Sequence, residues 1–393
     1  MNIQEANQYL TPNYARFPIT LTQGVGSRVQ DDTGQSYLDF VAGIAVNTLG
    51  HAHPAMVKTI HEQATTMLHC SNLYYNPQQN KLAKKLVELS TLDKVFFCNS
   101  GAEANETAIK LARKYFHDQG VNKFSIITAT QSFHGRTMQT IAATGQDKVK
   151  VGFTPLPQGF KHVPLNDIAA LENAIDDSTA AIMLEPLQGE GGVHLANIEY
   201  LEAVRTLCDN KGILLIFDEI QTGIGRCGTM FAFEKVGIKP DILTLAKGLG
   251  GGVPIGAMLA SEKVGVSLSA GSHGTTFGGN PMSCAVALTV LSVMEKEDIL
   301  NNVQARSTQF QIGLQKLVDT YTVFEEVRGD GLLLGIKASI DVAPIVNQCM
   351  KNGLLILMAG PQVLRFLPAL NITEEEIEEG LSLLSQSIEG LNL

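Results

Sequence analysis

Lys247 is the residue whose position most clearly suggests chemistry. It ends an apolar run, 242–246, and a glycine-rich loop, 248–252, follows it directly. An ammonium group at the tip of a buried strand loses hydration, which favours the neutral amine, and a neutral amine can attack an aldehyde to form a Schiff base. The alternative is a lysine that only extends its charge to water from the end of a strand.

An acid is expected near such a lysine, and a second apolar run supplies one. Residues 213–217 form a continuous apolar stretch that ends in Asp218 and Glu219. Open parallel sheets bind ligands at their strand ends, so Asp218 and Lys247 are expected at one edge. Pyridoxal 5′-phosphate needs both groups, because its aldehyde takes a lysine and its ring nitrogen takes an acid that keeps it protonated. The pair predicts this cofactor, with Lys247 and Asp218 as catalytic residues.

A phosphate site is indicated between another apolar run and an amphipathic helix. Residues 98–106 are rich in small and polar side chains, and apolar residues then recur at helical spacing as far as residue 115. Small residues such as Gly101 and Ala102 let backbone N–H groups approach a phosphate, and the helix N-terminus adds about half a positive charge. The alternative is an ordinary helix cap made by Asn99 or Ser100.

Two further strand ends carry polar or aromatic residues. After one of them, Phe133 is placed to stack on a cofactor ring, and Arg136 is placed to bind a substrate carboxylate with its guanidinium fork. After the other, Glu185 and Glu190 flank flexible glycines. The alternatives are a core phenylalanine with a surface arginine, and a pair of surface acids.

Other chemistries find little support in the sequence. His51 and His53 lack a third ligand nearby, so we expect no metal. The 248–252 loop is no Walker loop, because its lysine precedes the glycines. There is also no GxSxG motif of a serine hydrolase.

Composition narrows the class of protein. The chain has 393 residues, 45% of them hydrophobic and 17% charged, and a formal net charge of −10. That charge, without a clustered basic face, argues against nucleic acid as a partner. Neither a signal peptide nor an apolar run long enough to span a membrane is visible. Six dispersed cysteines without a CxxC pair suit reduced thiols in a cytoplasmic protein, and disulfides are not expected.

The order of apolar and amphipathic segments indicates the fold. Strand-like runs alternate with helical patterns, which predicts an α/β protein with a mainly parallel central sheet and a smaller α+β domain. We expect an N-terminal β segment, 1–50, that packs with the small domain, a large cofactor-binding domain, 51–297, and a C-terminal small domain, 298–393. The expected strands of the large domain are 95–98, 124–129, 180–184, 213–217 and 242–245. A long helix is expected from Pro281 to about residue 296, a short strand near 331–337 and a last helix from about Thr373.

Taken together and in this order, the motifs resemble the class III aminotransferases over essentially the whole chain. The resemblance implies a type I aminotransferase fold, pyridoxal phosphate as cofactor and a homodimer whose active sites lie at the subunit interface. The segments that carry it are 40–47, 50–54, 71–74, 100–106, 133–136, 185–190, 218–223, 247–248, 274–281 and 364–368.

The resemblance also implies roles around the cofactor. Lys247 would be the Schiff-base lysine, and Asp218 would hold the proton of the ring nitrogen. The remaining cofactor contacts would be backbone N–H groups of Gly101 and Ala102 to the phosphate, Thr276 to the phosphate of the other subunit, Gln221 to the ring hydroxyl, and Phe133 and Ile220 on the two faces of the ring.

For the substrates, the resemblance implies N-acetylornithine as amino donor and 2-oxoglutarate as acceptor. Arg136 would hold a carboxylate of either substrate, and Arg365 would pair with Glu190 until 2-oxoglutarate brings a second carboxylate. Gly43 would leave room for the acylated nitrogen, and Thr275 would also contact substrate.

Several alternatives stay open. The donor could instead be ornithine, N-succinylornithine, 4-aminobutyrate or an acyl-lysine. An isomerase of the same fold would need no switch for a second carboxylate. A scaffold protein without turnover would be expected to lack Lys247, Asp218 or Arg136, and all three are present.

Overall fold

The computed structural model describes residues 3–391 and 393, and its centre is a seven-stranded sheet. The strand order is β4-β12-β11-β10-β7-β5-β6, and only β12 runs antiparallel to its neighbours. The mainly parallel α/β sheet expected from the sequence is thus confirmed. The strands are β4 (Lys94–Cys98), β5 (Ser125–Ala129), β6 (Phe160–Val163), β7 (Thr179–Leu184), β10 (Leu214–Asp218), β11 (Ile242–Leu245) and β12 (Gly256–Ala260).

Both faces of this sheet are covered, which explains why its strands read as continuous apolar runs. Ile126 and Ile216 share one hydrophobic cluster with the apolar side of α5, whereas Ile127 and Leu215 belong to the larger core that includes α8 and α10. The helices around the sheet are α3 (Pro54–Thr66), α4 (Pro77–Ser90), α5 (Gly101–Asp118), α6 (Met138–Ala143), α7 (Ile168–Ala174), α8 (Ile198–Lys211), α9 (Glu262–Gly265) and α10 (Pro281–Lys296).

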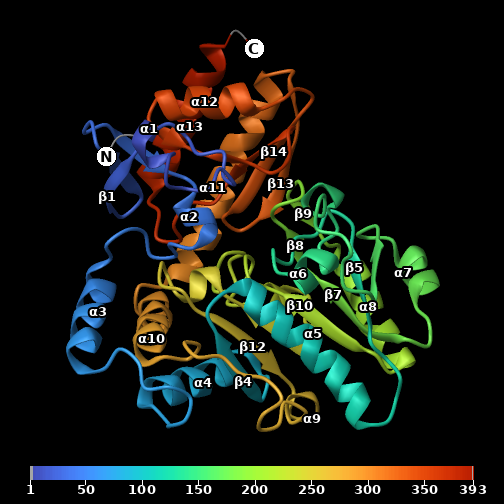
Figure 1. The fold of residues 1–393 in the computed structure, drawn as a ribbon. Coiled ribbons are helices and arrows are strands. Elements are labelled where there is room, and N and C mark those ends of the chain that lie inside the picture. The colour runs from blue at the N-terminus through green and yellow to red at the C-terminus, as the bar shows by residue number, and fades with distance from the viewer. Residues whose placement is uncertain (1–2, 392) are drawn as a thin grey trace.

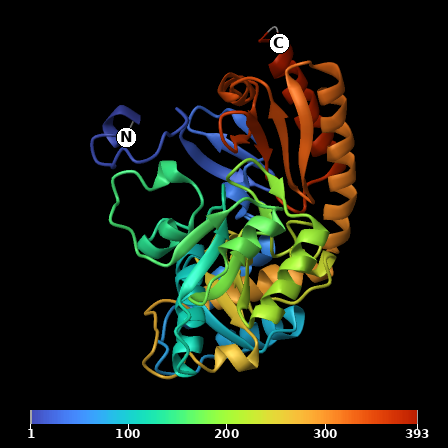
Figure 2. The same cartoon turned by 90° about the vertical axis from the view of Figure 1, so that its right-hand side faces the viewer.

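A second, smaller sheet lies above the first and is built mainly from the C-terminal part of the chain (Figures 1 and 2). Its order is β13-β14-β17-β16, with every pairing antiparallel. Its elements are α11 (Ile299–Thr320), β13 (Phe324–Asp330), β14 (Leu333–Ala338), α12 (Ala343–Lys351), β16 (Leu357–Met358), β17 (Val363–Phe366) and α13 (Glu374–Glu389). Thr373 caps α13 by accepting a hydrogen bond from the Glu376 amide at 3.2 Å, so the last helix begins where the sequence predicts.

The N-terminal part of the chain forms a small sheet with a strand of the C-terminal part. After α1 (Ile3–Ala6), β1 (Leu21–Val25), β2 (Arg28–Asp31) and β3 (Ser36–Asp39) form an antiparallel meander, and β15 (Leu354–Leu355) adds to β3 in parallel. Phe40 then packs edge-to-face on Phe310 of α11, with ring centroids 5.4 Å apart. The division into 1–50, 51–297 and 298–393 stays a prediction.

A left-handed turn follows β3. The four residues of α2 (Ala42–Ala45) all have positive φ, and Gly43 has φ +67° and ψ +27°. Only glycine adopts this conformation without strain, so the three non-glycine residues are held there by their surroundings.

Two expectations from the sequence concern the helices and the cysteines. Among the described residues, no helix is both long enough and apolar enough to cross a membrane. All six cysteines are free thiols, and five of them are buried.

Candidate active site

One cavity of about 430 Å³ opens at the carboxyl ends of β5, β7, β10 and β11. This is the sheet edge where the sequence placed the chemistry. Its lining includes Ser100, Gly101, Ala102, Phe133, His134, Arg136, Glu185, Glu190, Asp218, Ile220, Gln221 and Lys247. Nine residues predicted to form the site, all except Arg365, Gly43, Thr275 and Thr276, therefore meet at a single cavity.

Lys247 follows β11 and directs its amine into this cavity. Its φ of +37° is unusual for a residue other than glycine. Burial lowers the pKa of Lys247 below its ordinary value, while the charge of Glu190 acts in the opposite direction. A lowered pKa increases the fraction of neutral amine, which is the nucleophilic form.

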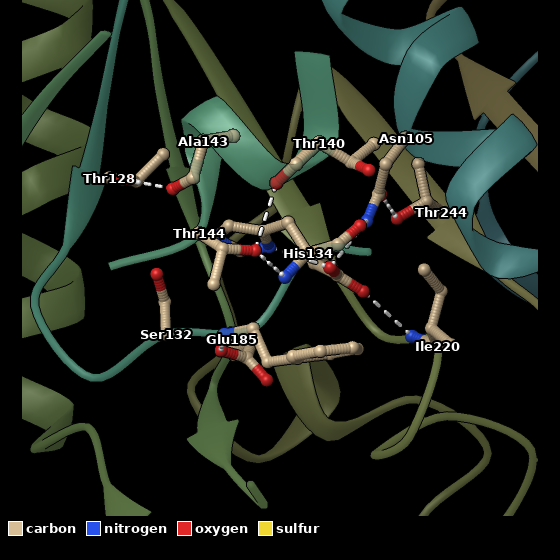
Figure 3. A network of polar contacts seen from close by, with 12 residues as sticks. Asn105, Thr128, Ser132, His134, Thr140, Ala143, Thr144, Glu185, Ile220 and Thr244 are labelled. Carbon is tan, nitrogen blue, oxygen red and sulfur yellow. Dashed lines mark hydrogen bonds and ion pairs between the residues drawn. The ribbon is translucent and has the colours of Figure 1, made fainter. Parts of the chain in front are cut away.

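Asp218 is the last residue of β10, and its carboxylate is held by three hydrogen bonds. Asn105 Nδ2 lies 2.7 Å and His134 Nδ1 2.8 Å from Oδ2, and the Ile220 amide donates to Oδ1 at 3.1 Å. Figure 3 shows Asn105, His134 and Ile220, the residues that supply these three donors, within one network of polar contacts. The side chain is only 3% exposed, so these donors replace the water that a carboxylate otherwise binds.

Sequence reasoning assigned no role to Asn105 or His134. Asn105 is completely buried on the packed side of α5, and its Oδ1 accepts a hydrogen bond from Thr244 at 2.7 Å. A polar residue in register with the apolar positions of an amphipathic helix is the signal that would have identified it. His134 gives no comparable signal, because its partner Asp218 lies 84 positions away.

The N-terminus of α5 fits an anion. Ser100 caps the helix by accepting the Glu103 amide at 3.2 Å, so the cap considered as the alternative is present. That cap uses the third amide of the helix and leaves those of Gly101 and Ala102, which have no partner inside a helix, beside the cavity. A side chain at Gly101 would meet Ile220 at 2.8 Å, which is why glycine stands there.

Phe133 and Arg136 also line the cavity. The guanidinium carbon of Arg136 lies 5.2 Å from the centre of the Phe133 ring, and Arg136 is exposed at the mouth of the cavity. The Phe133 amide donates to Glu185 Oε2 at 2.9 Å. Of the two alternatives considered for this pair, the surface arginine agrees with the exposure of Arg136, but Phe133 lines the cavity.

Glu190 and Gln221 line the cavity and form a polar group with Arg365, which does not line it. Arg365, on β17, is 2% exposed and donates to Glu190 Oε1 at 2.6 Å, and Gln221 Nε2 donates to the same oxygen at 3.2 Å. Burial raises the pKa of Glu190, but the charges of Arg365 and Lys247 outweigh burial and lower it to about 2. Gln221 Oε1 and Arg365 Nε are buried without a partner among the described residues.

Three of the expected site residues lie elsewhere. Gly43 lines a neighbouring apolar cavity of about 460 Å³, and a side chain there would meet Asn47 at 3.3 Å. Thr275 lines a third cavity and accepts a hydrogen bond from Asn99 at 3.1 Å, while Thr276 is exposed. The roles expected for these residues stay predictions.

The histidines of the 51–54 motif have protein partners. His51 Nε2 lies 2.8 Å from Asp39 Oδ2, and His53 Nδ1 accepts the Ala55 amide at 3.3 Å.

The groups around the main cavity match the needs of pyridoxal phosphate. They comprise an amine of lowered pKa, a carboxylate fixed by three donors, a helix N-terminus with free amides, and the amide oxygen of Gln221, which lacks a partner. A buried acceptor without a partner is costly, so Gln221 Oε1 fits a donor that a ligand would bring.

Comparison with known proteins agrees with this geometry. The family model of class III aminotransferases matches residues 9–388. The chain is 53% identical to the acetylornithine aminotransferase of Caldanaerobacter subterraneus over 379 residues, covering 96% of each chain. It is also 53% identical to that of Methanocaldococcus jannaschii over 374 residues, covering 95% of this chain and 94% of the relative.

Solved structures show the same fold. The N-acetylornithine aminotransferase of Stenotrophomonas maltophilia superposes with a TM-score of 0.85 at 42% identity over 98% of both chains. The ornithine aminotransferase of Toxoplasma gondii superposes with a TM-score of 0.95 at 34% identity, covering 99% of this chain and 94% of that one. A second structure of the Toxoplasma enzyme describes pyridoxal phosphate at its active site. These similarities confirm the expected aminotransferase fold.

Proposed function

Because this chain belongs to the class III aminotransferases, we propose that it transfers the δ-amino group of N2-acetylornithine to 2-oxoglutarate. The products are N-acetylglutamate 5-semialdehyde and glutamate, and the reaction is a step of arginine biosynthesis. The observation that carries the proposal is the meeting of Lys247, Asp218 and Glu190 at one cavity, in a chain whose relatives named acetylornithine aminotransferase match it nearly end to end.

Pyridoxal phosphate supplies an electron sink for the carbon that loses or gains the amino group. Lys247 would hold it covalently, and Asp218 would keep its ring nitrogen protonated. Gly101 and Ala102 would bind its phosphate through their amides. The remaining contacts we assign are Gln221 to the ring hydroxyl, with Phe133 and Ile220 on the two ring faces.

Lys247 has a second task once the amino donor has released it. Its neutral Nζ would accept the proton that leaves the donor carbon carrying the amino group. In the second half-reaction the same Nζ would donate a proton to C2 of the former 2-oxoglutarate. Burial supports this role, because it lowers the pKa of Lys247 and so increases the fraction of neutral amine.

Two substrates of different shape must use one cavity. We assign Arg136, exposed at the mouth with its guanidinium over Phe133, to a carboxylate of either substrate. The second carboxylate of 2-oxoglutarate would bind Arg365, which is paired with Glu190 when that carboxylate is absent. Because an unpaired buried guanidinium is costly, Glu190 makes the state with one carboxylate tolerable.

We further propose that the chain acts as a homodimer with shared active sites. Thr276, expected to reach the partner's cofactor phosphate, is exposed and does not line the cavity of its own chain. Large apolar side chains near it are exposed as well: Phe277 is 64%, Leu73 82% and Tyr75 92% exposed. A cluster of large apolar side chains exposed to solvent is typical of a surface that another protein chain covers, which supports a dimer interface here. Sedimentation velocity should give twice the chain mass, and a monomer would contradict this proposal.

A cytoplasmic location is proposed from the free thiols of the chain, which suit a reducing compartment.

Ornithine is the second candidate donor, favoured by the fold similarity to the Toxoplasma ornithine aminotransferase. The test is the visible absorbance of the purified holoenzyme, titrated without 2-oxoglutarate with N-acetylornithine or ornithine in separate cuvettes. A spectral change at far lower N-acetylornithine than ornithine supports the proposal. The reverse order would favour ornithine, and a holoenzyme without a visible band would contradict the role of Lys247.

A further inference from the structure

Glu185 is a buried acid of the main cavity to which no role has been given. It directly follows β7, is 6% exposed and lines the cavity beside Asp218. Its Oε2 accepts the Phe133 amide at 2.9 Å, and among the described residues its Oε1 has no hydrogen-bond partner. Figure 3 shows Glu185 close to the network of polar contacts that includes His134 and Asn105.

The surroundings of Glu185 contain more negative than positive charge. Asp218 on β10 and Glu190 in the loop after β8 (Leu187–Gln188) line the same cavity as Glu185, and so does Lys247 after β11. The charges of the two acids disfavour a charged Glu185, whereas that of Lys247 favours it. Glu190 already has the partner Arg365, and Asp218 has His134 and Asn105. Glu185 forms no ion pair with any described residue.

A buried carboxylate with one hydrogen bond and two neighbouring acids is costly in its charged form. Burial raises the pKa of Glu185 well above its ordinary value, the charge of Asp218 raises it further, and the Phe133 amide opposes both. The protonated acid has no such cost, because one oxygen still accepts the Phe133 amide and the other becomes an O–H donor.

We propose that Glu185 carries a proton in the working enzyme and is a positioning residue that presents an O–H donor to the cavity while its second oxygen holds the Phe133 backbone. A neutral Glu185 leaves Asp218 as the carboxylate that faces the cofactor ring nitrogen. It also adds no negative charge near Lys247, which would otherwise favour the protonated form of that amine. This inference rests on the proposed function in one respect, which is that the ligand beside Asp218 is the ring of pyridoxal phosphate.

Glutamine reproduces the protonated acid, since its oxygen accepts the Phe133 amide and its NH₂ group donates to the cavity. Aspartate, one methylene shorter, and alanine do not. We therefore expect Glu185→Ala to weaken cofactor binding at least tenfold and Glu185→Gln to recover most of that loss, measured by fluorescence titration of the apoenzyme with pyridoxal phosphate.

Stability against pH tests the proton without any substrate or cofactor. An acid whose pKa is raised by folding holds an additional proton in the folded state, so wild-type stability falls as pH rises above the ordinary glutamate pKa. Glutamine does not titrate, so the stability of Glu185→Gln should not show this decrease with rising pH. The melting temperature of the variant should therefore rise relative to wild type between pH 5 and 8, by roughly 1–3 °C.

Asp176→Asn is the matched control. Asp176 is an exposed acid whose pKa is lowered, first by the hydrogen bond of Lys161, so its contribution to stability is already complete at pH 5 and the difference from wild type should stay constant up to pH 8. A Glu185→Gln difference that stays constant or shrinks with rising pH would overturn the proposal.

Infrared spectroscopy gives a direct second reading of the proton. The difference spectrum of wild type minus Glu185→Gln at neutral pH should contain the C=O stretch of a protonated carboxylic acid. A carboxylate band in its place would overturn the proposal even if both proteins transaminate N-acetylornithine. A protonated Glu185 in a protein that prefers another donor would instead leave this inference intact and reject the proposed substrate.

Discussion

Arg365 Nη1 lies 2.6 Å from Glu190 Oε1, and this contact joins the small antiparallel sheet to the edge of the large one. The Arg365 side chain also donates to the Gly189 carbonyl at 2.7 Å, so two of its hydrogen bonds end in one loop. The Glu190 side chain keeps 28% of its surface exposed, whereas that of Arg365 keeps 3%. The acid can therefore turn toward the cavity at lower cost than the arginine, and Glu190 is the half of the pair expected to move.

Removal of Glu190 should affect the two half-reactions unequally. In Glu190→Ala the buried Arg365 loses its ionic partner whenever only one substrate carboxylate is present, so we expect the half-reaction with N-acetylornithine to slow more than the one with glutamate. Rapid-mixing spectroscopy of each half-reaction measures the two rates. Glu190→Gln, which keeps an acceptor for Arg365, should lie between wild type and alanine. Equal losses in both half-reactions would rule out the switch.

Substitution of Lys247 should abolish covalent cofactor attachment. In Lys247→Ala there is no amine to bind the aldehyde or to move the proton, so turnover should fall by about three orders of magnitude or more. Borohydride reduction followed by peptide mass spectrometry should find the cofactor on the peptide of Lys247 in wild type only. Lys247→Arg keeps a cation without a nucleophile and should behave like alanine. Turnover at the wild-type rate in either variant would contradict the assignment.

Five of the seven strands of the large sheet, and the residues at their ends, could be predicted because burial on both faces leaves a local signal, whereas β6 and β12 are not among the expected strands. The run 242–246 predicts β11 at Ile242–Leu245, and the acids after residue 217 mark the end of β10. Strand direction leaves no such signal: the antiparallel β12 reads like its parallel neighbours, because each of its residues is buried.

Contacts between distant residues could not be predicted either. Asn105 and Asp218 are 113 positions apart, and the sequence around either residue does not indicate their hydrogen bond. The left-handed turn around Gly43 is a further case, since Ala42, Ile44 and Ala45 ordinarily avoid positive φ and adopt it here through tertiary packing. The role of Gly43 at the substrate rests on the motif alone and stays a prediction; in the structure Gly43 lines the neighbouring cavity.

Asn105 should matter for stability as well as for the cofactor. Alanine at this position removes the donor to Asp218 and to the His134 carbonyl, and it leaves the Thr244 hydroxyl without its acceptor. Buried groups left unpaired in this way should cost about 2–3 kcal/mol of unfolding free energy. Urea unfolding of the apoenzyme measures this cost. Asn80→Ala, at an exposed asparagine of α4, is the control and should change stability by less than about 0.5 kcal/mol. An Asn105→Ala protein as stable as this control would contradict the network.

His162 should make the protein sensitive to acid. Its Nδ1 lies 2.7 Å from Thr128 Oγ1, which itself donates to the Ala143 carbonyl, and its Nε2 lies 3.0 Å from Lys150 Nζ (Figure 3 shows the Thr128 contact to Ala143). The hydroxyl thus accepts from the ring and the ammonium donates to it, which is the pattern of a neutral imidazole. Burial first, and the charge of Lys150 second, lower the pKa of His162 from 6.5 to about 4.

The unfolded chain therefore binds one more proton than the folded protein between pH 4 and 6.5, and stability should fall as pH drops through this window. With allowance for the partial exposure of the ring, His162 should account for a loss of about 1–2 kcal/mol of unfolding free energy across this pH window. His162→Leu should lack this loss, so its difference from wild type should move in favour of the variant as pH falls from 7 to 4, measured by urea unfolding at a series of pH values. His117→Gln, at an exposed histidine of α5, controls for the loss of a histidine as such. A His162→Leu difference that does not vary with pH would show that this imidazole is protonated equally in both states.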